Sequence, residues 1–151
     1  MLAKGATTGW EQWNGHENWS HIHASFLSLD SWFYQGIAGI RPDESAPGFR
    51  KILIKPAIVG DITWAKATYQ SIHGPIVSHW KLDGARLKMN VTIPANTTAI
   101  IHVPGDKGTI QESGQPAAHA PGVKFLRVEG DRALYEVGSG AYTFESTLPR
   151  S

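Results

Sequence analysis

The residues best suited to chemistry lie in one short stretch, residues 5–20, which reads GATTGWEQWNGHENWS. The stretch holds three tryptophans and two carboxylates: Trp10, Glu11, Trp13, Glu17 and Trp19. An indole ring can stack on the C–H face of a pyranose while a carboxylate acts on the polar edge of the same sugar. A glutamate in a polar loop is most often a solvated surface group, but the flanking tryptophans favour a carbohydrate site.

The spacing of the three tryptophans limits how many of them can contact one sugar. Trp10, Trp13 and Trp19 follow one another at intervals of three and six residues, which do not place all three on one face of a helix or strand. We therefore expect two of them beside a sugar pocket and at least one in a hydrophobic core.

Other chemistries find less support in the residue pattern. His16, His21 and His23 are separated by five and two residues, which is not the spacing of a metal-binding pair on a helix. The chain has no cysteine, and no serine lies in a nucleophile-elbow sequence. We expect no metal and no cofactor.

One amphipathic helix is predicted after this stretch, from about Ser20 to Gly36. Its apolar residues recur at helical intervals, and four of its side chains are aromatic: Phe26, Trp32, Phe33 and Tyr34. Gly36, Gly39 and Pro42 are predicted to end it. We assign Trp32 and Phe33 to packing, and because no second strong helix follows, the apolar stripe requires a partner surface from elsewhere.

The remainder of the chain predicts an antiparallel β-sandwich of about eight or nine strands. Short alternating segments are separated by turn sequences such as Asp83-Gly84 and Pro104-Gly105. Asp106 to Gly122 is predicted to be a long loop with at most one short strand. Trp64, Tyr69 and Trp80 are possible sugar platforms, although alternation predicts that most of their area is core. The segments expected to be strands are 52–54, 62–69, 76–80, 87–93, 99–103, 123–128, 133–137 and 141–144.

Composition excludes some partners. The 151 residues carry a net charge of +1, without a dense basic run, so we expect neither nucleic acid nor a membrane as partner. No stretch resembles a signal peptide or a membrane span. We therefore expect a soluble, cytoplasmic protein.

Several motifs in consistent order resemble the C-terminal part of bacterial α-L-rhamnosidases. The resemblance covers about two thirds of the chain, and beyond Gly105 it fades. It implies that residues 1–42 are the last loop and last helix of a catalytic (α/α) barrel, and that residues 43–151 are the C-terminal antiparallel β-sandwich. The motifs are GATTGWEQW at 5–13, WFY at 32–34, AGIRP at 38–42, PGFR at 47–50, IKP at 54–56, SIHGPIVSHW at 71–80 and VTIPANTTA at 91–99.

The resemblance also implies a mechanism and roles for particular residues. Members of this family invert the anomeric centre with one carboxylic acid and one carboxylate base, which lie about 6.5–9.5 Å apart. Glu11 matches the family's general base, and the general acid has no counterpart in this chain. His23 matches an active-site histidine, but Ile22 stands where the family often has asparagine. With Trp10, Trp13 and Trp19, His23 is predicted to bind substrate.

Two functions of different classes follow. The first is the C-terminal fragment of an α-L-rhamnosidase-like inverting hydrolase, inactive as an isolated chain because it lacks the general acid. The alternative is a non-catalytic carbohydrate-binding or structural β-sandwich module. Expected partners are a rhamnosyl glycan or L-rhamnose, and either the missing barrel or a second copy of the chain, bound through the N-terminal aromatic helix.

Overall fold

The computed structural model describes residues 2–6, 8, 10, 22 and 30–148. The chain divides into two compact units, Met1–Phe33 and Tyr34–Ser151. In the first unit the described elements are a short 3-10 helix, η1 (Leu2–Lys4), and the helical residues 30–33; the helix continues into the second unit to residue 37. The last residues of that helix, η2 (Phe33–Ile37), are π-helical.

Residues 30–36 of the predicted helix over 20–36 are observed as helix, Ile22 lies in no helix or strand, and residues 20, 21 and 23–29 lie outside the described part of the chain. Trp32 and Phe33 are 49% and 56% exposed, and their rings meet edge to face with centroids 5.7 Å apart. Both side chains of the predicted apolar stripe are therefore exposed in the described part of the chain, and their packing against a partner surface stays a prediction.

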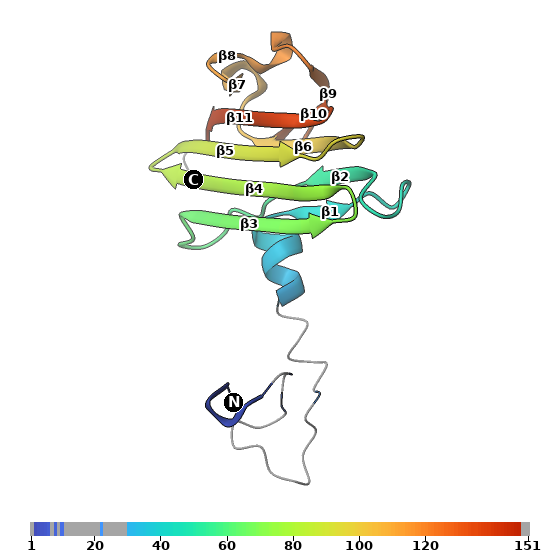
Figure 1. Cartoon of the computed structure of the whole chain (residues 1–151). Helices are drawn as coiled ribbons and strands as arrows, with labels where there is room; N and C mark the ends of the chain where they lie inside the picture. The colour runs from blue at the N-terminus through green and yellow to red at the C-terminus, as the bar shows by residue number, and fades with distance from the viewer. Residues whose placement is uncertain (1, 7, 9, 11–21, 23–29, 149–151) are drawn as a thin grey trace. The chain divides into compact units, whose positions relative to one another are not determined.

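The second unit is a β-sandwich of two sheets, seen as two layers in Figure 1, where β3, β4 and β5 lie side by side in one layer. The five-stranded sheet has the order β1 (Ile40–Pro42), β2 (Lys51–Ile54), β6 (Thr98–Pro104), β10 (Arg132–Val137) and β9 (Val123–Glu129). The six-stranded sheet has the order β3 (Trp64–Ser71), β4 (Gly74–Asp83), β5 (Arg86–Ile93), β11 (Gly140–Thr147), β7 (Gln111–Glu112) and β8 (Gln115–Pro116).

Eight of these strands correspond to predicted segments, so the mainly β sandwich is confirmed. The prediction missed β1, because Gly39 and Pro42 signal an end to regular structure. It allowed at most one short strand in Asp106 to Gly122, where β7 and β8 pair with each other beside two 3-10 helices, η3 (Lys107–Thr109) and η4 (Ala117–His119). One pairing, between β2 and β6, is parallel rather than antiparallel.

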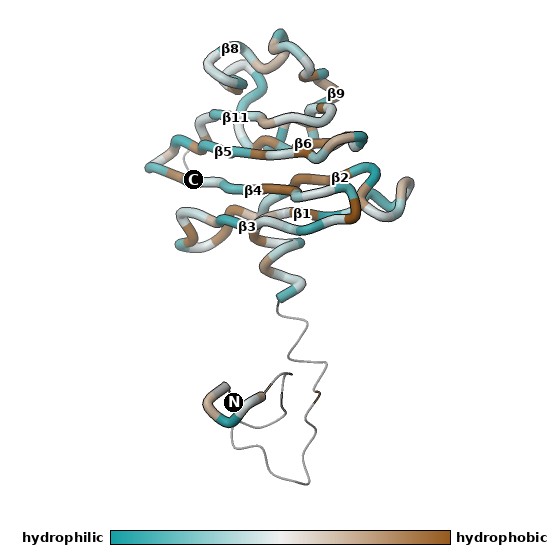
Figure 2. Tube along the Cα trace, in the orientation of Figure 1, coloured by the Kyte–Doolittle hydropathy of each residue, from teal (hydrophilic) through white to brown (hydrophobic). Residues whose placement is uncertain are grey.

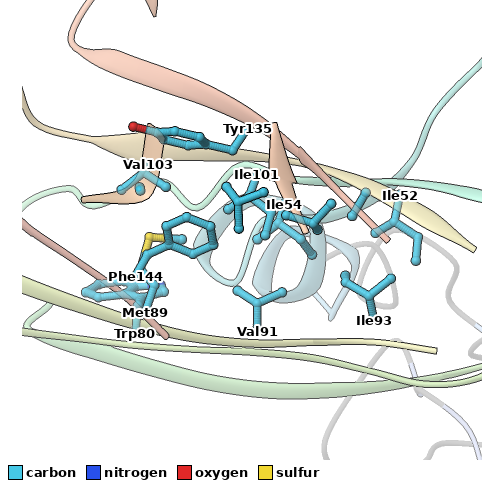
Figure 3. Packing of buried hydrophobic residues seen from close by; sticks show 14 of the residues in the cluster. Ile52, Ile54, Trp80, Met89, Val91, Ile93, Ile101, Val103, Tyr135 and Phe144 are labelled. Carbon is cyan, nitrogen blue, oxygen red and sulfur yellow. The ribbon is translucent and has the colours of Figure 1, made fainter. Parts of the chain in front are cut away.

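The core lies between the two sheets. Alternation along β2 and β6 places Ile52, Ile54 and Ile101 toward the interior, each fully buried. Figure 2 shows the hydrophobic residues concentrated along β2 and β6 and a mixed hydropathy along β4 and β5. In Figure 3 Ile101, Val103 and Tyr135 of the five-stranded sheet face Met89, Val91 and Phe144 of the other sheet.

Candidate functional site

The residues predicted to act on a sugar belong to the first unit. Glu11, Trp13, Trp19 and His23 lie outside the described residues, as do His16 and His21. Trp10 is described and is partly exposed. The proposed roles of these residues therefore stay predictions, and the described geometry concerns the sandwich and the end of the helix that leads into it.

The end of the helix is fixed by side chains of β4. The last carbonyl groups of a helix have no partner within the helix and need one from elsewhere. Trp80 Nε1 donates a hydrogen bond of 2.9 Å to the carbonyl oxygen of Ile37, and Ser78 Oγ donates one of 2.7 Å to that of Ala38. Both donors are buried. The sandwich thus holds the helix end by polar contacts inside its core.

Gly39 allows the chain to pass closely over the segment after β2. Its φ is 75°, and a Cβ atom at this position would lie 2.2 Å from the carbonyl carbon of Lys55. The Lys55 amide donates to the Gly39 carbonyl at 2.9 Å, and the Ala57 amide donates to the Gly36 carbonyl at 2.9 Å. Gly39 was predicted only to end the helix, but it also makes this backbone contact possible.

An aromatic surface lies where the helix end meets the sandwich. We define it as Tyr34, Phe49, Tyr69 and Ile72. The rings of Phe49 and Tyr69 have centroids 4.7 Å apart, and those of Tyr34 and Tyr69 have centroids 6.2 Å apart. Ile72 is 86% exposed, and its Cδ1 atom lies next to Gly48. This surface is a partly exposed apolar patch of the sandwich.

A groove lies on the outer face of the six-stranded sheet. A cavity of about 400 Å³ is lined there by Trp64, Trp80, Ala65, Lys66, His79, Lys81, Lys88 and Asn90. Trp64 is 63% exposed, whereas Trp80 is 2% exposed and points into the core. The prediction that most of the side-chain area is core was right for Trp80 and for Tyr69, which is 37% exposed, and wrong for Trp64. The exposure of Trp64 could have been predicted from the sequence, because Trp64 shares its face of β3 with the polar residues Lys66 and Thr68.

Burial is the main cause of the lowered pKa values of two histidines in the sandwich. Burial disfavours the charged form of His102 and, with the nearby charge of Lys55, lowers its pKa from 6.5 to about 4. Burial and then the charge of Lys66 lower the pKa of His79. The described residues contain no group of three or more histidine, cysteine, aspartate or glutamate residues placed to hold a metal ion.

None of the helices in the described ranges is both long and apolar enough to cross a membrane.

Comparison with known proteins points to one family throughout. The family described as the bacterial alpha-L-rhamnosidase C-terminal domain matches residues 39–118. An alpha-L-rhamnosidase of Streptomyces avermitilis is 34% identical over 95% of this chain and 14% of its own length. One of Formosa agariphila is 28% identical over 96% of this chain and 16% of its own length.

Solved structures agree with this assignment. The crystal structure of the Streptomyces avermitilis alpha-L-rhamnosidase complexed with L-rhamnose matches 97% of this chain and 14% of that chain, with a TM-score of 0.76 and 31% identity. The alpha-L-rhamnosidase from Dictyoglumus thermophilum matches 96% of this chain and 16% of that chain, with a TM-score of 0.75 and 34% identity. The chain thus spans 14–16% of the length of these relatives. Since the family match covers more than half of its residues, this chain belongs to the bacterial alpha-L-rhamnosidase C-terminal domain family.

Proposed function

We propose that this chain is the C-terminal portion of an inverting α-L-rhamnosidase-like hydrolase, to which it contributes the general base, Glu11. The observation that carries the proposal is the extent of the similarity. The family domain begins at residue 39, yet 95% of the chain matches the Streptomyces avermitilis enzyme. Most of residues 1–38 must therefore be included in that match. The proposed division is residues 1–42 as the end of the catalytic barrel and 43–151 as the sandwich.

In this proposal Glu11 acts on water. Its carboxylate takes a proton from a water molecule whose oxygen bonds to the anomeric carbon as the glycosidic bond breaks. The leaving oxygen receives a proton from a carboxylic acid supplied by the upstream part of the protein. Two of the three tryptophans Trp10, Trp13 and Trp19 lie beside the sugar ring together with His23, and the sugar is a terminal α-L-rhamnosyl residue.

The sandwich has a structural role in this proposal. The hydrogen bonds from Trp80 to Ile37 and from Ser78 to Ala38 hold the end of the helix that follows the active-site loop. A catalytic group displaced by a small distance loses much of its effect. The sandwich therefore supports the position of the last barrel helix.

A chimera tests the role of Glu11. The matching C-terminal part of the Streptomyces avermitilis enzyme is replaced by this chain, and hydrolysis of an aryl α-L-rhamnoside is measured. We expect turnover with inversion of configuration, and a decrease in kcat of about 10²–10⁴-fold in Glu11→Gln. Glu44→Gln, an exposed carboxylate outside the predicted site, is the matched control. An active chimera that keeps its rate with Glu11→Gln would rule out Glu11 as the base.

We further propose that the catalytic part of the larger protein covers the exposed aromatic side chains of the helix, including Trp32 and Phe33. Without that part, the isolated chain associates with itself because large apolar side chains are exposed. Analytical ultracentrifugation of the 151-residue chain should show concentration-dependent dimers or larger species. A monomer at every concentration would contradict this partner assignment and would leave the Glu11 proposal to its own test.

A further inference from the structure

The groove on the six-stranded sheet is built from side chains that share two cross-strand rows. Antiparallel pairing places directly opposite residues with their Cβ atoms about 4.5–5.5 Å apart. The first row is Trp64, Lys81, Lys88 and Glu145, and the second is Lys66, His79, Asn90 and Thr143. Each row runs across β3, β4, β5 and β11, so the groove crosses the middle of the sheet.

The groove is longer than the cavity beside Trp64. A second cavity of about 550 Å³ also contains Lys81 and Lys88 in its lining and extends to Gln111 and Thr147. The two cavities therefore meet at this pair of lysines. This second part carries charges of both signs, from Asp83, Arg86 and Glu145, so the excess of positive charge is confined to the end beside Trp64. An extended ligand can lie along the combined groove, with one end at the indole of Trp64.

The charges beside Trp64 are of one sign. Lys66, Lys81 and Lys88 line the cavity that contains Trp64, and no carboxylate does. Lys88 Nζ lies 2.9 Å from Glu145 Oε1. Lys66 and Lys81 form no ion pair within the part of the chain that the structure describes. Two ammonium groups thus remain available to an anion next to an exposed indole.

The groove also offers neutral hydrogen-bond donors. Thr143 Oγ1 donates a hydrogen bond of 3.1 Å to Asn90 Oδ1. This bond engages the amide oxygen of Asn90, so its two amide N–H donors remain for a ligand. A hydroxyl-bearing ligand with a carboxylate satisfies both the amide and the lysines.

We propose that this groove binds an acidic oligosaccharide, with one uronic-acid ring against Trp64 and its carboxylate beside Lys66 and Lys81. A pyranose has an apolar C–H face for the indole and hydroxyl groups for Asn90. A nucleic acid is a less suitable ligand, because the chain has a net charge of only +1 and no dense basic run. The binding is separate from the hydrolysis proposed for Glu11.

Calorimetric titration of the 151-residue chain with trigalacturonate tests the proposal. The probes for comparison are maltotriose, which has no carboxylate, and a hexathymidylate. At an ionic strength of about 0.01 M, where screening is weak, trigalacturonate should bind about tenfold or more tightly than either comparison probe. Binding should weaken as salt is added. No binding of trigalacturonate, or binding of hexathymidylate with equal affinity, would overturn the proposal.

Matched substitutions locate the ligand. Trp64→Ala should weaken trigalacturonate binding about tenfold or more, and the double variant Lys66→Gln/Lys81→Gln should do the same. The controls are Val128→Ala and Lys124→Gln, an exposed apolar side chain and an exposed lysine on β9. Circular dichroism checks that each variant is folded. Equal loss in the controls, or none in the folded Trp64→Ala variant, would show that the groove is not the site.

Discussion

The outer faces of the two sheets differ in the solvent exposure of their outward-facing residues. On the six-stranded sheet the outward residues surround a groove in which Trp64 is 63% exposed. On the five-stranded sheet His102 and Leu134 are opposite one another, face outward, and are only 6% and 1% exposed. One face is therefore closed by the protein's own side chains, and the other is left open.

Long basic side chains lie near the closed face. Lys55, Arg127 and Arg132 lie close enough to His102 to act on its charge, together with Glu129. The aliphatic parts of such side chains can cover apolar surface while their charged ends reach water. A residue that strand alternation places on the outer face of a sheet is therefore not necessarily exposed to solvent. A covered face contributes to stability, and an open face is available to a ligand.

Truncation of Leu134 should have the largest effect on stability. We expect Leu134→Ala to lower the free energy of unfolding by about 2–5 kcal/mol, because it removes a buried side chain and leaves a cavity. Trp64→Ala should change the free energy of unfolding by less than about 1 kcal/mol, although it removes more atoms, because most of the side chain is exposed. Urea denaturation measures both. Similar losses in the two variants would contradict the contrast between the faces.

Trp64 on β3 and Trp80 on β4 allow an exposed and a buried tryptophan of one sheet to be compared. Trp80→Phe removes the N–H that donates to the Ile37 carbonyl and leaves that buried acceptor unpaired. We expect a loss of about 1–3 kcal/mol in the free energy of unfolding. Trp64→Phe makes the same chemical change on the exposed side and serves as the control. The expected order would be refuted if Trp64→Phe cost as much as Trp80→Phe.

The sequence predicts the sandwich well and its outer surfaces poorly. Alternation along β5 and β6 identifies both strands, because one side of each is uniformly apolar. Alternation does not show which outward residues are covered. The charged side chains near His102 come from the segment after β2 (Lys55) and from the β9–β10 hairpin (Arg127 and Arg132), which the alternation along β6 does not reveal. The predicted Trp–Glu loop carries a family resemblance, but its geometry lies outside the described residues.

The closed face should also make stability depend on pH. The pKa of His102 falls from 6.5 to about 4 on folding, so the unfolded chain binds a proton that the folded chain does not between these values. The stabilisation is complete above pH 6.5 and is lost as the pH falls toward 4, by at most about 1.4 kcal/mol per pH unit. Urea denaturation at several pH values from 7 to 4 gives the free energy of unfolding. This free energy should change less with pH in His102→Gln than in the wild-type chain. The same change with pH in His102→Gln as in the wild-type chain would contradict this expectation.

The smallest effect is expected for the ion pair at the centre of the open groove. Lys88 and Glu145 are 2.9 Å apart, but their side chains are 55% and 48% exposed. Water screens such a pair, so a double-mutant cycle with Lys88→Gln and Glu145→Gln should give a coupling free energy of about 0.2–1 kcal/mol. A coupling well above this range would mean that the groove is more enclosed than its exposed side chains indicate. A small coupling that falls further with added salt is expected of an open face, on which Lys88 can exchange Glu145 for the carboxylate of a ligand.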